Sequence, residues 1–177
     1  RVAEPTPLRG VLTAANGAVG APFLKEGSPL KAAAALAAGL IMGIGTYHDT
    51  EKGQKLGKNT AYVLELDDLR VCHLGDLGHV PTPEQVEELS GVDILLAPVG
   101  GFYTIDASEA THLVERMAPR VVVPMHFRTE KGRSDLDPVS RFLQEMGLKD
   151  AAVESRVNVS RSNLPKETRV VVLEQRR

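Results

Sequence analysis

The stretch His73-Leu74-Gly75-Asp76-Leu77-Gly78-His79 directly follows an apolar strand and places an acidic side chain where that strand ends. Gly75 and Gly78 flank the acid and allow the tight backbone that brings a short side chain close to a ligand. A second apolar segment, residues 121–125, is followed directly by His126. Carboxylates and imidazoles bind divalent metals, so the two strand ends form a candidate metal site.

Composition sets the class of protein before any motif is considered. The 177 residues are enough for one domain, residues 1–177, with a real core. The net charge of −2 gives no electrostatic reason to expect nucleic acid or an anionic membrane as a partner. The glycine-interrupted run 32–47 is too short to span a bilayer, and no signal peptide is visible. The single cysteine, Cys72, lies in an apolar strand and suits a reducing compartment, so we expect a cytoplasmic protein.

Strands and helices alternate after residue 38. We expect strands at 40–44, 62–66, 69–74, 92–97, 120–125 and 168–173, with a two-residue hairpin turn at 67–68. Capping boxes starting at Thr82 and Asp106 predict helices over 83–89 and 107–117, and a third helix runs from 137 to 146 with Gly147 at its end. Residues 1–38 are rich in glycine and proline and are expected to be irregular. Within them, 31–38 is either a helix, with Ser28 as the N-cap and Pro29 at the first helical position, or a mobile segment with little fixed structure.

The order of these elements predicts that Asp76 and His126 meet. Segments 69–125 alternate strand, helix, strand, helix, strand, and crossovers of this length make the three strands parallel. Asp76, the pair Gly100-Gly101 and His126 then follow carboxyl ends at one edge of the sheet, where open α/β sheets bind ligands. His48 also follows a strand, and His79 is near enough to Asp76 to lie over the site.

Each of these residues also has a simpler interpretation. An aspartate after a strand can serve only as a turn former, and a histidine there can be a hydrogen-bonded loop residue. His73 lies within its strand and is expected to pack or to sit at an edge, while His112 lies opposite the apolar stripe of its helix and is expected to be exposed. A flavodoxin-like phosphate-binding domain also fits the element order, but the glycine-rich loop it needs is missing.

Five segments together resemble the metallo-β-lactamase superfamily of metal-dependent hydrolases, in particular its lactonase-like and uncharacterised branch. They are residues 45–49, 57–60, 73–79, 98–106 and 124–126. The resemblance implies an α/β fold, the αββα sandwich, with one or two divalent ions, zinc or manganese, at one edge. It matches His48, Asp76 and His126 to the family's metal ligands, and we take Asp76 and His79 as the catalytic candidates. The implied activity is hydrolysis of a small ester, lactone, phosphodiester or amide by metal-activated water.

The sequence departs from the family in one respect. The family's main metal motif, His-x-His-x-Asp-His, is absent, and no histidine precedes His48. We therefore expect the C-terminal portion of the sandwich, without much of its N-terminal half. Some apolar strand residues would then lack a covering layer, which favours a homo-oligomer. We expect the set of Val63, Val71, Val121 and Val123 to include some of them. The alternative function is a non-catalytic remnant that serves as a binding or assembly module.

Overall fold

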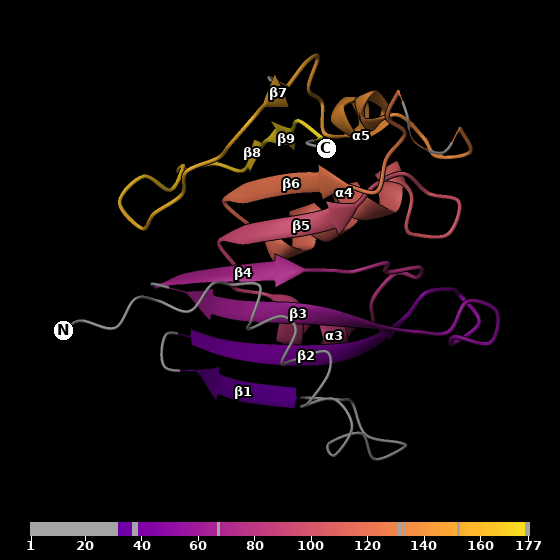
Figure 1. Ribbon diagram of the computed structural model, residues 1–177, viewed down its shortest axis with the longest axis horizontal. Helices are drawn as coiled ribbons and strands as arrows, with labels where there is room; N and C mark the ends of the chain where they lie inside the picture. Colours follow the sequence, from indigo (N-terminus) through magenta and orange to yellow (C-terminus); the bar gives the residue numbers. More distant parts are fainter. Residues whose placement is uncertain are drawn as a thin grey trace.

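A seven-stranded sheet forms the body of the protein in the computed structural model, which describes residues 32–36, 39–66, 68–130, 132, 134–151 and 153–175 (Figure 1). The strand order is β1-β2-β3-β4-β5-β6-β8, and β7 pairs with β9 in a separate two-stranded sheet. The bounds are β1 Ala32–Leu36, β2 Gly39–Tyr47, β3 Lys58–Leu66, β4 Leu69–His73, β5 Ile94–Pro98, β6 Val121–Met125, β7 Val153–Glu154, β8 Arg169–Val170 and β9 Val172–Leu173.

The sheet is antiparallel in its first half and parallel in its second. Strands β1 to β4 pair antiparallel, with the expected hairpin pairing Leu66 with Leu69, and β4, β5, β6 and β8 pair parallel. This confirms the predicted parallel arrangement. Because β2 and β4 are both antiparallel to β3, the carboxyl ends of β2, β4, β5 and β6 lie on one edge, together with the amino end of β3. We call this the carboxyl edge.

Helices α3 (Pro83–Leu89) and α4 (Ala107–Met117) lie on one face of the sheet (Figure 1). Both begin with the predicted capping boxes, Thr82 with Gln85 and Asp106 with Glu109. The third helix, α5 (Val139–Glu145), begins two residues later than predicted. No helix in the described part of the chain has the length and apolarity needed to cross a membrane.

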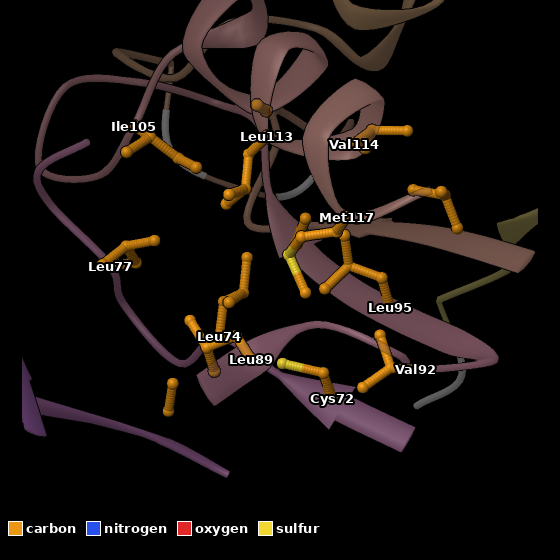
Figure 2. Packing of buried hydrophobic residues seen from close by; sticks show 14 of the residues in the cluster. Cys72, Leu74, Leu77, Leu89, Val92, Leu95, Ile105, Leu113, Val114 and Met117 are labelled. Carbon is orange, nitrogen blue, oxygen red and sulfur yellow. The ribbon is translucent and has the colours of Figure 1, made fainter. Parts of the chain in front are cut away.

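The main core fills the space between the helices and one face of the sheet (Figure 2). Val63 of β3, Cys72 of β4 and Leu95 of β5 have no exposed surface. They pack against α3, α4 and Phe142 of α5, since alternate residues of each strand point to this face. The helix-covered sheet confirms the expected α/β class.

A second cluster covers part of the opposite face of the sheet. Val121 (2% exposed) and Val123 (7% exposed) pack with Val171 and with the C-terminal residues Val157 and Leu173. Of the four residues among which some were expected to be uncovered, Val121 and Val123 are therefore covered, as is Val63 in the main core. Of the four named examples, only Val71 is half-buried.

Two other expectations are corrected at the ends of the described chain. Ala32–Leu36 forms strand β1 and is neither a helix nor an unstructured segment. It pairs antiparallel along β2, and this pairing outweighs the helix propensity of alanine. Ser28 and Pro29 lie outside the described residues. The expected strand 168–173 is divided at Val171, since Arg169–Val170 pairs with β6 and Val172–Leu173 pairs with β7.

The buried Cys72 thiol gives the first prediction. Burial raises the pKa of Cys72 to about 12 from 9.0, with the positive charge of Arg70 partly opposing it. Alkylation by iodoacetamide at pH 8 is expected to be on the order of a thousandfold slower in the folded chain than in urea, because the reactive thiolate is that much scarcer. The folded state should also lose stability as the pH rises above 9.0, since only the unfolded chain then releases the proton. Rapid labelling of the folded chain would contradict this placement.

Candidate functional site

Backbone hydrogen bonds tie the loops of the carboxyl edge to one another. Gly78 N, in the loop after β4, donates to Tyr47 O at the end of β2 (2.9 Å). Ile105 N, in the loop after β5, donates to Leu77 O (2.8 Å). Asp137 N, in the segment after β6, donates to Gly100 O (2.9 Å). The segments that carry His48, Asp76 and His126 therefore form one connected edge.

His48 and Asp76 come together at this edge. The distance from His48 Nε2 to Asp76 Oδ2 is 3.6 Å, which is beyond a direct hydrogen bond. Zinc bonds of about 2.0–2.2 Å at a tetrahedral angle place two ligand atoms about 3.4 Å apart, so this separation fits two ligands of one ion. The side chains are 23% and 55% exposed, respectively, which leaves the carboxylate open to solvent and to a ligand. The pair therefore fits part of a metal site.

His126 lies at the end of β6, and its backbone is held in an uncommon conformation. Its φ of +52° is in the left-handed region, which costs a non-glycine residue on the order of 1–3 kcal/mol. Its Nδ1 is buried and has no hydrogen-bond partner among the described residues, and the same is true of His48 Nδ1. Within the described part of the chain, no group of three His, Cys, Asp or Glu side chains is close enough to hold a metal ion. The structure thus joins two of the predicted ligands, and the role of His126 stays a prediction.

The contacts of His79 distinguish its two ring nitrogens. Its Nδ1 lies 2.9 Å from Val80 O, and a carbonyl can only accept, so Nδ1 carries the proton in the neutral ring. Nε2 is then the unprotonated nitrogen, and it is buried without a hydrogen-bond partner among the described residues. The His79 ring packs against Tyr47, next to His48, with ring centroids 5.6 Å apart. His79 therefore lies close to the segment that carries His48.

The other two histidines have the positions expected from the sequence. His73, the last residue of β4, is half-buried, and its Nδ1 accepts a hydrogen bond from Gly75 N (3.0 Å). Burial lowers the pKa of His73, and the negative charge of Asp76 partly opposes that shift. His112 is exposed on α4 and serves as a control position.

The Asp49 carboxylate stabilises the loop after His48 through hydrogen bonds, a role that the sequence did not predict. Its Oδ1 accepts hydrogen bonds from the N–H groups of Glu51 (2.8 Å) and Gly53 (2.8 Å), and its Oδ2 accepts from Lys55 (3.1 Å) and Leu56 (2.7 Å). These bonds, that from Leu56 foremost, lower the pKa of the Asp49 carboxyl against the opposing effect of burial. The available sequence signal is an aspartate that opens a polar, glycine-containing loop.

Asp49→Ala should make the loop after His48 more mobile. The amides of residues 51, 53, 55 and 56 lose their acceptor, and we expect hydrogen exchange there to be at least about 10-fold faster. In the wild-type chain the carboxylate stabilises the loop fully above its unfolded pKa of 3.8, and this stabilisation is lost as the pH falls through the lower folded pKa. Glu51→Gln, which removes only an exposed ion pair with Lys55, is the matched control. Unchanged exchange in Asp49→Ala would show that the carboxylate does not organise the loop.

The sequence also did not predict the side-chain contacts of Asn59, at the amino end of β3. Its side-chain Oδ1 accepts from Asp76 N (3.1 Å), and its Nδ2 donates to Thr46 Oγ1 (2.7 Å) and Leu74 O (2.8 Å). These partners lie 13 to 17 residues away along the chain, so no local pattern indicates them.

The chain is similar in sequence to proteins named metal-dependent hydrolases. The family model described as "Beta-lactamase superfamily domain" matches residues 11–126. A protein named metal-dependent hydrolase from Thermococcus onnurineus is 37% identical over 91 residues, which are 50% of this chain and 41% of that protein. One from Pyrococcus horikoshii is 36% identical over 91 residues, 50% of this chain and 40% of that protein. The match therefore spans only about two fifths of these curated relatives.

The fold of the chain is also similar to that of solved metallo-hydrolase structures. A Thermotoga maritima protein assigned to the Zn-dependent hydrolases of the metallo-β-lactamase superfamily is 39% identical, with a TM-score of 0.68 over 80% of this chain and 68% of that one. A metallo hydrolase from Ignicoccus hospitalis, 24% identical with a TM-score of 0.54 over 92% of this chain and 61% of that one, shares the fold. With the family model matching more than half of the sequence, the chain belongs to the metallo-β-lactamase superfamily.

Proposed function

We propose that this chain supplies the His48–Asp76–His126 side of the active site of a metal-dependent hydrolase. The observation that carries the proposal is the 3.6 Å approach of His48 Nε2 to Asp76 Oδ2 at the carboxyl edge, in a chain whose relatives are named metal-dependent hydrolases. His126, with its buried and unpartnered Nδ1, is the third proposed ligand. Among the described residues no three such side chains lie close enough to hold a metal ion, so the His48–Asp76 pair is the part of the proposed site that supports it most directly.

Each proposed residue has a role that follows from the chemistry of its side chain. A divalent cation, zinc or manganese, supplies Lewis acidity and lowers the pKa of water when it is bound. Asp76 provides the negative charge that attracts the cation, and His48 provides a neutral nitrogen donor next to it. His126 follows β6 at the same edge, with a left-handed backbone conformation (φ +52°), and its imidazole is the third proposed donor.

His79 is the proposed proton carrier. Its Nδ1 is committed to Val80 O, so Nε2 can take a proton from water and later return it to the leaving group. Tyr47 packs against the ring and limits its movement, which preserves the direction of that nitrogen.

The substrate proposed is a small ester, lactone, phosphodiester or amide. The test is a hydrolysis assay on one substrate of each class, before and after treatment with a chelator. We expect activity toward at least one class, loss of that activity on chelation, and recovery when zinc or manganese is restored. His79→Ala should lower the turnover number while leaving metal content unchanged. Activity that survives complete metal removal would contradict the proposal.

The alternative is a binding or assembly module that keeps the fold and lacks catalysis. It is favoured by the absence of a three-residue metal group among the described side chains. A protein that binds no zinc or manganese and hydrolyses none of the four substrate classes would establish this alternative.

A further inference from the structure

Asn59 connects the two segments that carry His48 and Asp76. It is the second residue of β3. The amino end of β3 lies between the carboxyl ends of β2 and β4 (Figure 1). Its Nδ2 donates to Thr46 Oγ1 (2.7 Å), two residues before His48, and its Oδ1 accepts from the backbone N–H of Asp76 itself (3.1 Å). One amide group therefore fixes one segment relative to the other.

The hydrogen-bond partners allow only one orientation of this amide. The Asp76 N–H can only donate and the Leu74 carbonyl (2.8 Å from Nδ2) can only accept, so oxygen and nitrogen cannot be exchanged. The turn also packs tightly on the amide, because a Cβ at Gly75 would lie 2.4 Å from Asn59 Oδ1. Gly75 has a φ of +62°, so both its space and its backbone conformation require glycine.

We infer that Asn59 is a positioning residue that sets the separation between His48 and Asp76. The effect of Asn59 on cation binding rests on the proposed function, whereas its positioning of Asp76 relative to His48 does not. Thr46 is 2% exposed, so the hydroxyl that Asn59 contacts belongs to a fixed part of β2. Asp76 follows a glycine and has an exposed side chain, so the bond from Asn59 restrains an otherwise loosely held residue. Groups that orient metal ligands typically change metal affinity or activity by 10- to 100-fold when they are removed.

The test compares Asn59→Ala with two matched variants. Asn59→Asp keeps an oxygen for the Asp76 N–H and removes both donors. Asn163→Ala removes the same kinds of bond elsewhere, since Asn163 Oδ1 accepts from Ser160 N (2.7 Å) and Nδ2 donates to Asn158 O (3.2 Å). Two readouts are taken from each protein: Zn²⁺ affinity by competition with a chromophoric chelator, and hydrogen exchange of the Asp76 amide without metal, followed by NMR.

Asn59→Ala is expected to weaken Zn²⁺ binding about 10- to 100-fold and to speed exchange at Asp76 at least about 10-fold. Asn59→Asp should retain the protection of the Asp76 amide, and Asn163→Ala should change neither readout. Wild-type Zn²⁺ affinity together with wild-type exchange in Asn59→Ala would overturn the inference. Loss of the Asp76 protection in a folded Asn59→Asp would also overturn it, because the acceptor oxygen is still present.

The two proposals fail in different ways. If the wild-type protein binds neither Zn²⁺ nor Mn²⁺, the proposed function is wrong, and the exchange measurement alone decides whether Asn59 positions Asp76. If Asn59→Ala does not fold, the folded Asn59→Asp protein decides through the protection of the Asp76 amide.

Discussion

Asp76→Asn is expected to lower the affinity of the protein for zinc or manganese at least about 100-fold. Asparagine keeps the shape of the side chain but removes the negative charge that a divalent cation requires. Residues that only orient ligands already cost 10- to 100-fold when they are changed, so loss of a direct ligand should cost more. His126→Ala should have the same effect because it removes a proposed nitrogen donor. Metal analysis after equilibrium dialysis measures both.

His112→Ala is the control for these two variants. This histidine is exposed on α4, and its removal should change neither metal content nor stability. Far-ultraviolet circular dichroism and thermal unfolding of each variant show whether the fold is intact. Unchanged metal content in both Asp76→Asn and His126→Ala would contradict the ligand assignment.

Gly78→Ala should damage both the fold and the site. A Cβ at this position would lie 2.2 Å from the carbonyl carbon and oxygen of His48 and 2.7 Å from Asp49 N, all of them backbone atoms. Gly78 N is also bonded to Tyr47 O, so the loop cannot move away without losing that bond. We expect a loss of about 1–3 kcal/mol in the free energy of unfolding, together with weaker metal binding.

Gly147→Ala is the control for Gly78→Ala, because it adds backbone strain without steric crowding. Gly147 has a φ of +70°, and a Cβ added there would meet no heavy atom within 4 Å among the described residues beyond its chain neighbours. Alanine at this position therefore costs only the left-handed strain of about 1–2 kcal/mol. Metal affinity should stay at the wild-type value in this variant. Denaturant unfolding and metal titration of Gly78→Ala and Gly147→Ala provide the comparison. Wild-type metal binding in Gly78→Ala would argue against a close fit between the loop after β4 and His48.

Helices α3 and α4 and the parallel strands could be predicted because their signals are local. Thr82 with Gln85 and Asp106 with Glu109 lie three residues apart and satisfy each other's backbone groups within one turn. Crossover length alone makes β4, β5 and β6 parallel, and that places Asp76 and His126 at one edge. The general location of the candidate site follows from these local signals.

The remaining features depend on contacts between distant parts of the chain. Ala32–Leu36 becomes a strand only because it pairs with the edge of β2, and the chain changes sheets at Val171 because β6 and β7 each offer a partner. The Asn59 bonds require the register of β3 with both of its neighbours before the amide can reach Thr46 and Leu74. Neither propensity nor spacing carries that information.

The proposed metal site requires His48 and Asp76 to bind a common metal ion. Its most direct test is a crystal structure of the zinc-loaded protein with data collected on both sides of the zinc absorption edge. We expect an anomalous peak within bonding distance of His48 Nε2 and Asp76 Oδ2, at about 2.0–2.2 Å from each atom. A fully loaded protein whose zinc lies elsewhere, with His48 and Asp76 free of it, would contradict the claim.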